Sequence, residues 1–272
     1  MPRARFDESY GANPAENYER FFTPSIGEPL AQALLERAAV QPNERVLDVA
    51  CGTGVLARLL AHSVGPNGGL AGLDPNPAML AVARSVTHAS DEIQWYEAAA
   101  ETMPLRAESF DVVLCQMGLQ FMPDRSAALR EMQRVLARNG RLLLSVPGPI
   151  PGIFDDLASA LSRFVGPPAA GFVRQVFSLH DLAEMDGIIA AAGFAQVEVQ
   201  AEEHDLKLPP PRQFLWQYVH STPLSVSASQ MDASARAEFE REVLDAWAVS
   251  GGDRGLDLRL RMVVASATKA AA

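Results

Sequence analysis

The sequence predicts an α/β fold built on a mostly parallel sheet of seven strands, with helices on both faces. Short apolar runs alternate with segments whose apolar residues recur at helical spacing, as in successive strand–helix units. Four such units precede residue 147 and imply parallel strands joined by right-handed crossovers. The last strand segments alternate apolar with polar residues, so one of their faces meets solvent. The seven expected strands are 46–50, 69–74, 93–97, 110–117, 141–146, 194–207 and 256–265.

Length, composition and charge limit the class of protein. The chain has 272 residues, of which 48% are hydrophobic and 21% charged, as in an ordinary globular domain. Its net charge of −10 repels phosphate backbones and argues against nucleic acid as a partner. No apolar run approaches the roughly 20 residues that span a bilayer, and residues 1–7 lack the apolar segment of a signal peptide. We therefore expect a cytoplasmic protein, monomer or homodimer, whose partner is a small molecule and not a membrane.

The amino-terminal part leads into a glycine turn. A loose tail over residues 1–12 precedes a helical pattern over 13–40, which prolines and a glycine divide into two pieces. The first strand then runs into a turn containing Gly52 and Gly54, which permit tight turning and close approach of a ligand to the backbone. Helical spacing resumes at 55–64, so a helix begins beside this turn and its free N–H groups suit an anion.

The second half of the chain contains further helices. An amphipathic helix follows the fourth strand through residue 137, with Asn139-Gly140 as its expected C-cap. A helix over 153–165 ends at a break over 166–168, and Ser178 with Asp181 predicts a capping box for the next helix. Three prolines at 209–211 open a helical insertion between the last two strands, which closes at 251–253.

The segment Asp48-Val49-Ala50-Cys51-Gly52-Thr53-Gly54 is compatible with two cofactor families. The spacing Gly52-x-Gly54-x-x-Ala57, with an acid about twenty residues downstream, fits the dinucleotide fingerprint. Asp48, an acid inside the strand, favours the other family. With it, the segment resembles the first motif of the class I S-adenosylmethionine-dependent methyltransferases, in particular the ubiquinone/menaquinone-biosynthesis and small-molecule subgroup. The resemblance implies a Rossmann-like sheet whose last strand is antiparallel.

The resemblance continues after the second strand. Asp74, followed by Pro75 and Met79, is similar to the family's strand-two motif, in which the acid binds the ribose and the methionine packs on the adenine. By itself, Asp74 could also be a cap for the next helix.

The third motif departs from the family pattern. Ala100-Glu101 matches it, but Ala99 stands where the family commonly has the Asp that recognises the adenine amino group. Adenine recognition must then rest on backbone groups, on Glu101 or on Glu97. Gln116 begins a closely matching block at the end of the fourth strand.

The cofactor that the resemblance implies is S-adenosyl-L-methionine, which leaves as S-adenosyl-L-homocysteine. Tyr18 matches a tyrosine that caps the methionine end of the cofactor in the family; surface packing of an aromatic ring is the alternative reading. The residues expected to hold the cofactor are Tyr18, Asp48, Ala50, Gly52, Thr53, Gly54, Asp74, Pro75, Met79, Ala100, Glu101 and Gln116.

We expect one domain over residues 1–272, with a core of 13–147, 178–207 and 253–268. Two helical insertions, 147–178 and 208–252, are expected to close over the substrate, and we call them the lid segments. Helical spacing leaves open whether the lid aromatics line a substrate pocket or form the core of the lid. The expected substrate-binding residues are Phe22, Gln120, Trp216, Tyr218 and His220.

The expected reaction is methyl transfer to a small organic molecule, an apolar or aromatic specialised metabolite, by in-line displacement that depends on positioning and desolvation. His220 and Tyr18 are the candidate catalytic residues, whereas His180 and His204 are as well explained by surface or packing roles. No zinc pattern is present, and the two cysteines fit small buried positions, so no metal is expected. A nicotinamide-dependent oxidoreductase and a non-catalytic, cofactor-binding regulator remain as alternatives.

Overall fold

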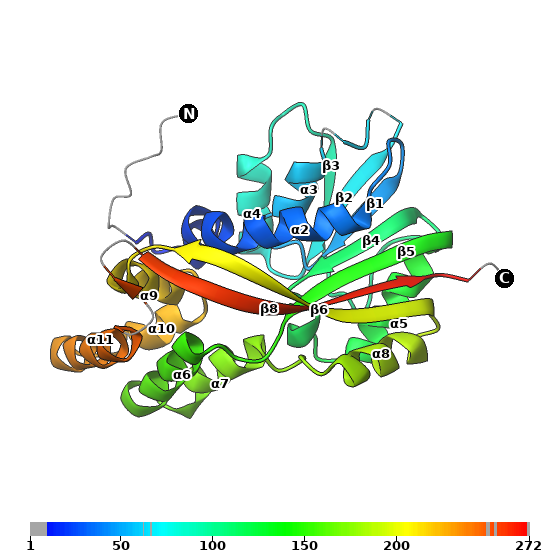
Figure 1. Ribbon diagram of the computed structural model, residues 1–272. Helices are drawn as coiled ribbons and strands as arrows, with labels where there is room; N and C mark the ends of the chain where they lie inside the picture. Colours follow the sequence, from blue (N-terminus) through cyan, green and yellow to red (C-terminus); the bar gives the residue numbers. More distant parts are fainter. Residues whose placement is uncertain (1–9, 62, 66, 249–250, 253–254, 271–272) are drawn as a thin grey trace.

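A twisted sheet forms the centre of the protein. The computed structural model describes residues 10–270, apart from 62, 66, 249–250 and 253–254 (Figure 1). The strand order is β3-β2-β1-β4-β5-β8-β6; the first five strands pair in parallel, and β8 is antiparallel to both β5 and β6. This strand order confirms the expected seven-stranded sheet. A short additional strand, β7, pairs with β8. The strands are β1 Arg45–Val49, β2 Gly69–Asp74, β3 Ile93–Glu97, β4 Phe110–Gln116, β5 Leu136–Pro147, β6 Ala195–Leu208, β7 Gly251–Gly252 and β8 Gly255–Thr268.

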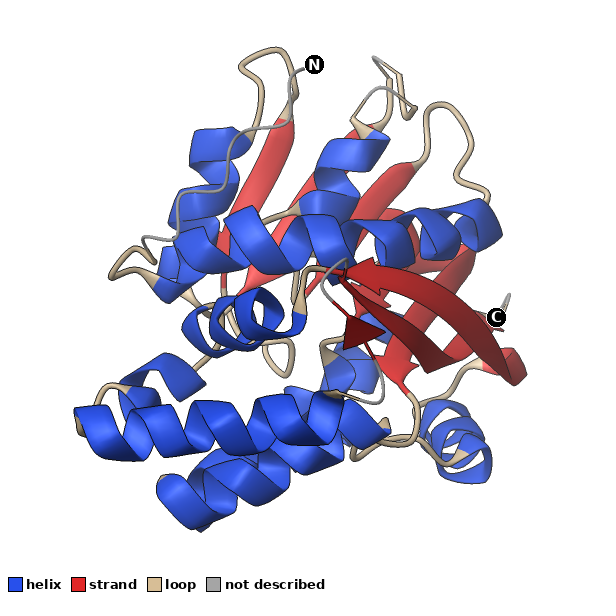
Figure 2. Ribbon diagram, turned by 60° about the vertical axis from the view of Figure 1, so that its left-hand side comes forward, coloured by secondary structure: helices blue, strands red, loops and turns tan. Residues whose placement is uncertain are grey.

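Helices cover both faces of this sheet (Figure 2). Along β4, Val112 and Leu114 join the cluster that contains α2 and α3, whereas Val113 and Cys115 join the cluster that contains α5 and α8. Because successive strand residues point to opposite faces, a strand buried on both sides reads as one continuous apolar run. The helices are α1 Pro14–Asn17, η1 Tyr18–Gly27, α2 Glu28–Ala38, α3 Val55–Leu60, α4 Pro77–Val86, η2 Leu119–Phe121, α5 Arg125–Val135, α6 Gly152–Phe164, α7 Pro167–Val176, α8 Leu182–Ala191, α9 Pro211–His220, α10 Leu224–Ala228 and α11 Ala233–Trp247.

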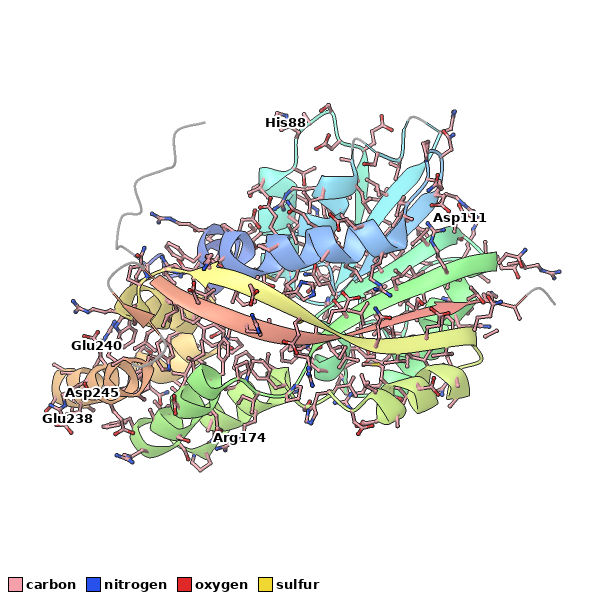
Figure 3. The ribbon with its side chains drawn as sticks, viewed as in Figure 1. His88, Asp111, Arg174, Glu238, Glu240 and Asp245 are labelled. Atoms are coloured by element: carbon pink, nitrogen blue, oxygen red, sulfur yellow. The ribbon has the colours of Figure 1, made fainter. Side chains whose placement is uncertain are left out.

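The helices of the two lid segments pack together at one side of the sheet (Figure 1). Phe239, Val243 and Trp247 form the buried stripe of α11, and the indole N–H of Trp247 donates to the carbonyl of Ile153 at 2.9 Å. Figure 3 shows Glu238 and Asp245 of α11 on the outer side of this group, where both are exposed. An apolar stripe at helical spacing therefore holds the lid segments to each other.

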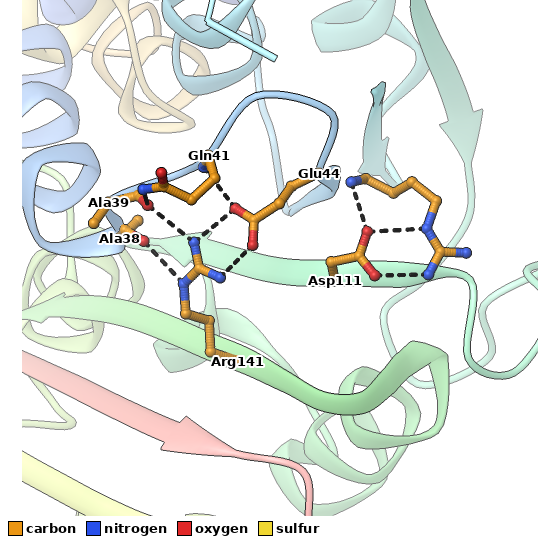
Figure 4. A network of polar contacts seen from close by, with 7 residues as sticks. Ala38, Ala39, Gln41, Glu44, Asp111 and Arg141 are labelled. Carbon is orange, nitrogen blue, oxygen red and sulfur yellow. Dashed lines mark hydrogen bonds and ion pairs between the residues drawn. The ribbon is translucent and has the colours of Figure 1, made fainter. Parts of the chain in front are cut away.

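Charge pairs tie the elements together at the amino-terminal ends of the strands (Figure 4). The Arg141 guanidinium donates to both oxygens of Glu44, at 2.6 and 2.8 Å, and to the Ala38 carbonyl that ends α2. Arg45 makes a similar two-point contact with Asp111, at 2.7 and 3.0 Å. These hydrogen bonds hold the pKa values of the Glu44 and Asp111 carboxyls below their usual range.

Two expected helix boundaries are wrong. The amino-terminal helix does not break at Pro24 but continues through η1 in wide π-helical turns, which accommodate a residue without an N–H group. The helix after the fourth strand ends at Val135 instead of residue 137, and Asn139-Gly140 lies in a bulge inside β5. A Cβ at Gly140 would meet the Asp111 carbonyl at 2.9 Å, so the bulge requires glycine for close approach of two backbones.

Two further local expectations, at residues 166–168 and 178–181, need correction. The expected break at 166–168 is also the start of a helix, α7, with Pro167 in its first turn. The N-cap of α8 is Asp181, whose carboxylate accepts from the Glu184 N–H at 2.8 Å, whereas the Ser178 hydroxyl donates to the Gln175 carbonyl. Residue 253 of the expected turn at 251–253 and the tail before residue 10 lie outside the described residues.

Candidate active site

A cavity of about 710 Å³ lies between the carboxyl-terminal ends of the strands, the amino-terminal helix and the lid segments. Its wall includes the ends of β1, β2 and β4, which is where open α/β sheets bind ligands. Eight of the expected cofactor-binding residues line the cavity: Tyr18, Ala50, Gly52, Asp74, Pro75, Met79, Ala100 and Glu101. The expected substrate residues that line it are Phe22, Gln120 and Tyr218.

Asp74 presents its carboxylate to this cavity from the end of β2. One oxygen accepts from the Gly52 N–H and the other from the Asn76 N–H, each at 2.9 Å. These bonds fix the orientation of the carboxylate and leave further lone pairs for a ligand. Burial raises the pKa of Asp74, although both backbone N–H groups oppose that shift.

The two glycines of the turn have different roles. Gly52, at φ +54°, faces the cavity, and a Cβ there would lie 4.0 Å from the Tyr18 ring, in space that a ligand can use. A Cβ at Gly54, at φ +81°, would lie 2.3 Å from the Trp95 indole. Gly54 does not line the cavity; it leaves room for Trp95, which also packs on Gly72. Only Gly52 is placed to let a ligand approach the backbone.

Asp48 lies beneath the turn and is not part of the cavity wall. It accepts a backbone hydrogen bond from Ala57 in the first turn of α3, and its Oδ2 has no partner within the described part of the chain. Burial and the neighbouring Asp74 raise its pKa well above the usual range. Thr53 is buried close by, also outside the wall, and its carbonyl accepts from Arg58.

The backbone N–H groups of this turn are engaged within the protein. Gly52 donates to Asp74, Gly54 donates to the Cys51 carbonyl at 2.8 Å, and Ala57 donates to Asp48. The sequence favoured an anion at this helix start, and two of these N–H groups already donate to the chain's own carboxylates, Asp74 and Asp48.

The amino-terminal helix forms one side of the cavity. Tyr18 stacks on Phe22 with ring centroids 4.6 Å apart. Burial, Asp74, Glu19 and Asp48 together raise the pKa of Tyr18 far above its usual range, so the phenol stays protonated and neutral. Gln116 does not line the cavity; its amide donates to the Gly27 carbonyl at 3.0 Å and fastens the helix to the sheet.

Two of the expected lid residues face away from the cavity. The indole N–H of Trp216 donates to Glu240 at 2.5 Å, and the Arg236 guanidinium lies 4.0 Å from its ring centroid, so Trp216 belongs to the lid core. His220 stacks on Tyr10 with centroids 4.4 Å apart, and burial lowers its pKa. Neither is among the residues lining the cavity, nor are His180 and His204.

The structure adds residues that the sequence did not single out. Asp124 lines the cavity beside Glu101 and caps α5 by accepting from the Ala127 N–H at 2.9 Å. An acid directly before an amphipathic helix is a cap signal that could have been read from the sequence. Apolar residues whose role no local pattern predicts complete the wall: Phe154, Phe172, Val176 and Phe177 from the first lid segment, and Met117, Phe121, Leu258 and Leu260 from outside the lid segments.

The charge of the cavity wall limits its ligand. The charged residues among its described lining residues are Asp74, Glu101 and Asp124, all acidic, with no Lys, Arg or His. A wall whose charged groups are acids suits a cationic nucleoside such as S-adenosylmethionine, and it would repel a pyrophosphate. Within the described chain no group of three His, Cys, Asp or Glu side chains forms a metal site.

Known proteins resemble this chain over its core and over its whole fold. Residues 47–144 match the methyltransferase domain family. The chain is 41% identical over 113 residues to the ubiquinone/menaquinone biosynthesis C-methyltransferase UbiE of Hahella chejuensis, covering 40% of this chain and 45% of that protein. It is 32% identical over 180 residues to the demethylmenaquinone methyltransferase of Staphylococcus aureus, covering 62% of this chain and 75% of the relative.

A solved structure has the same fold at low sequence identity. The Haemonchus contortus phosphoethanolamine N-methyltransferase 2, in complex with S-adenosyl-L-methionine, superimposes with a TM-score of 0.62 at 18% identity, covering 100% of this chain and 62% of that one. Among the described residues, no helix has the length and apolar character needed to cross a membrane.

Proposed function

This chain belongs to the class I S-adenosylmethionine-dependent methyltransferase family, and we propose that it transfers a methyl group from S-adenosylmethionine to a small apolar or aromatic acceptor. The observation that carries the proposal is the cavity at the strand ends, with Asp74 and the open face of Gly52 on one wall and apolar lid side chains on the other.

The cofactor half of the cavity fits the nucleoside. Asp74, with free lone pairs on both oxygens, is suited to accept from the ribose hydroxyls, and Met79 offers an apolar surface for the adenine. Ala99 lines the wall without a polar side chain, so we propose Glu101, which also lines the wall, as the acceptor for the adenine amino group. When bound, S-adenosylmethionine supplies a methyl group activated by its positive sulfur.

The chain's own contribution is positioning and exclusion of water. Tyr18 is neutral and can donate a hydrogen bond, but its raised pKa keeps the phenol protonated, so no phenolate is present to act as a base. We propose that His220, packed on Tyr10, supports the amino-terminal helix instead of moving a proton. The apolar lid side chains exclude water around the reacting groups, so orientation and desolvation supply the rate acceleration.

The acceptor is a small organic molecule of apolar or aromatic type. The aromatic lid residues on the cavity wall support this, and so do the names of the relatives, which act in quinone biosynthesis. A specialised metabolite and a quinone-related ring both belong to this class.

Calorimetry with S-adenosylhomocysteine, followed by radiolabelled methyl transfer from S-adenosylmethionine to a panel of aromatic acceptors, tests the proposal. We expect saturable binding of the nucleoside, no binding of NAD or NADP, and labelled product with at least one acceptor. Absence of nucleoside binding would contradict the proposal. Binding without transfer to any acceptor would instead favour a non-catalytic, cofactor-binding protein.

A further inference from the structure

Resting on the proposed function, we infer that Asn17 is a positioning residue that couples the cofactor half of the cavity to the acceptor half. Asn17 joins residues 10–27, which we call the amino-terminal cover, to the end of α9 in the second lid segment. Through this link, a nucleoside bound against the cover orders the part of the lid that borders the acceptor. Asn17 is buried and is not among the residues lining the cavity, so it acts through its neighbours.

The Asn17 amide is held by three hydrogen bonds to two segments that lie far apart in the sequence. Its Nδ2 donates to the Gly11 carbonyl at 2.8 Å and to the His220 carbonyl at 3.1 Å, and its Oδ1 accepts from the Gly11 N–H at 3.1 Å. Of the two amide ends only the nitrogen can donate to carbonyls, so these partners fix the orientation of the side chain. His220 ends α9, where the last carbonyls have no partner within the helix, and Asn17 supplies one.

The two segments that Asn17 joins both contribute to the cavity wall. On the cover, Tyr18 follows Asn17 directly and lines the cavity beside Gly52. On the lid, the residues on either side of His220 line the cavity. These lid residues are Tyr218, Ser221, Thr222 and Pro223. A change at the contact between Asn17 and His220 therefore reaches the cofactor side and the acceptor side of the wall together.

A second polar contact ties the cover to the glycine turn. The Arg58 guanidinium of α3 forms an ion pair with Glu19 of the cover at 2.6 Å, and it also donates to the Thr53 carbonyl in the turn. Both side chains of the pair are largely buried, which makes such a charge-assisted contact firmer than an exposed one. Successive polar contacts thus connect the glycine turn to the cover and the cover to α9.

This connection gives the nucleoside a route by which it orders the lid. A ligand that contacts both the turn and Tyr18 stabilises the arrangement in which turn and cover lie together, and the Asn17 link extends that preference to α9. The stack of Tyr10 on His220, with ring centroids 4.4 Å apart, adds an apolar contact between the same two segments. The expected consequence is ordered binding, in which the acceptor half of the cavity is completed after the nucleoside is bound.

Hydrogen–deuterium exchange of the full chain, with and without saturating S-adenosylhomocysteine, tests this inference. In the wild type we expect the nucleoside to slow amide exchange in residues 211–222 by at least about fivefold, the lower end of typical coupling between sites. Asn17→Ala removes the donor to the His220 carbonyl, so this effect on α9 should fall below about twofold. The amides of η1 should slow in both proteins, and calorimetry sets the saturating concentration for each.

Asn13→Ala is the matched control for this substitution. Asn13 caps the same short helix, α1, by accepting from the Ala15 N–H at 3.0 Å. The control variant therefore loses a local hydrogen bond but keeps the Asn17 donors, and we expect wild-type protection of α9 by the nucleoside. Equal loss of that protection in both variants would show that it depends on the stability of α1, which overturns the assignment to Asn17.

Two other results overturn the inference. One is protection of α9 that persists in Asn17→Ala, because the nucleoside would then order α9 without this link; the other is no protection of α9 in the wild type. Should Asn17→Ala not fold, Glu19→Gln probes the same route from the Arg58 side: it should lower the protection of α9 by at least about twofold, and unchanged protection overturns the inference. Failure of S-adenosylhomocysteine to bind the wild type would instead be a failure of the proposed function.

Discussion

Replacing Asp74 with Asn tests the proposed ribose contact at almost constant shape. In the wild-type protein each Asp74 oxygen accepts one backbone N–H at 2.9 Å. The Asn side chain keeps one oxygen that accepts from one of these two backbone N–H groups, but its NH₂ group stands opposite the other N–H group and cannot accept from it. The variant therefore loses one internal hydrogen bond, while removal of a buried charge with a raised pKa offsets part of that loss. We expect the free energy of unfolding without ligand to change by no more than about 1 kcal/mol.

The expected effect on ligand binding is much larger. A hydrogen bond to a charged group contributes about 1.5–3 kcal/mol, and each 1.4 kcal/mol is a factor of ten in affinity, so we expect Asp74→Asn to weaken S-adenosylhomocysteine binding by roughly 10- to 150-fold. Isothermal titration calorimetry at constant pH and salt measures this difference directly.

Glu97→Gln is the matched control for this experiment. Glu97 pairs with Asp74 across the neighbouring strands, carries the same charge and does not line the cavity. If the affinity for S-adenosylhomocysteine depended only on the negative potential at this sheet edge, Asp74→Asn and Glu97→Gln would weaken binding by similar factors. We expect Glu97→Gln to lose less than about threefold, as for an exposed charge. A loss below threefold in Asp74→Asn, or equal losses in both variants, would refute the reasoning.

Three further predictions separate stability from binding. Gly54→Ala forces a Cβ to within 2.3 Å of Trp95, so it should lower the free energy of urea unfolding by at least about 2 kcal/mol. Gly52→Ala should lower that free energy by about 1–2 kcal/mol because of its positive φ, but it should weaken nucleoside binding more than Gly54→Ala does. A larger loss of stability in Gly52→Ala together with a larger loss of affinity in Gly54→Ala would contradict these roles. Asp48 has a raised pKa in the folded state, so it binds a proton more tightly there than in the unfolded chain. The contribution of Asp48 to stability should therefore fall as pH rises from about 4. Replacing it in Asp48→Asn should change the difference in unfolding free energy between about pH 5 and about pH 8, with the variant gaining stability relative to the wild type at the higher pH; an unchanged difference would contradict this. Phe239→Ala empties a fully buried position in the lid and should cost about 3–5 kcal/mol, with acceptor turnover lost before nucleoside affinity; equal loss of both would argue against a separate lid.

The features that the sequence predicted correctly depend on short-range patterns. The first two strands lie within one residue of their expected positions because strands buried on both faces require continuous apolar runs. The edge strand β3 is not buried, and its β-favouring residues predicted it. Asp74 and Gly52 are brought to one cavity wall because the ends of parallel strands share one edge of the sheet.

The features that the sequence missed depend on contacts between distant segments. Spacing alone could not distinguish Tyr218, which lines the cavity, from Trp216, which packs in the lid core, because both lie on buried parts of α9. Gly54 looked like a ligand-binding glycine, yet its neighbour is Trp95 from β3. Gln116 looked like a cofactor contact, but it holds the carbonyl of Gly27 from a helix 89 residues away in sequence.

By itself, the sequence determined the seven main strands, the acid beneath the glycine turn, the acid at the end of β2 and the class of cofactor, because each follows from the residues of short segments. Only the tertiary structure decided which side chains face the cavity and which fill the space between helices. That choice depends on how α9, η1 and the strand ends pack against one another, and packing between segments far apart in the chain leaves no local pattern in the sequence.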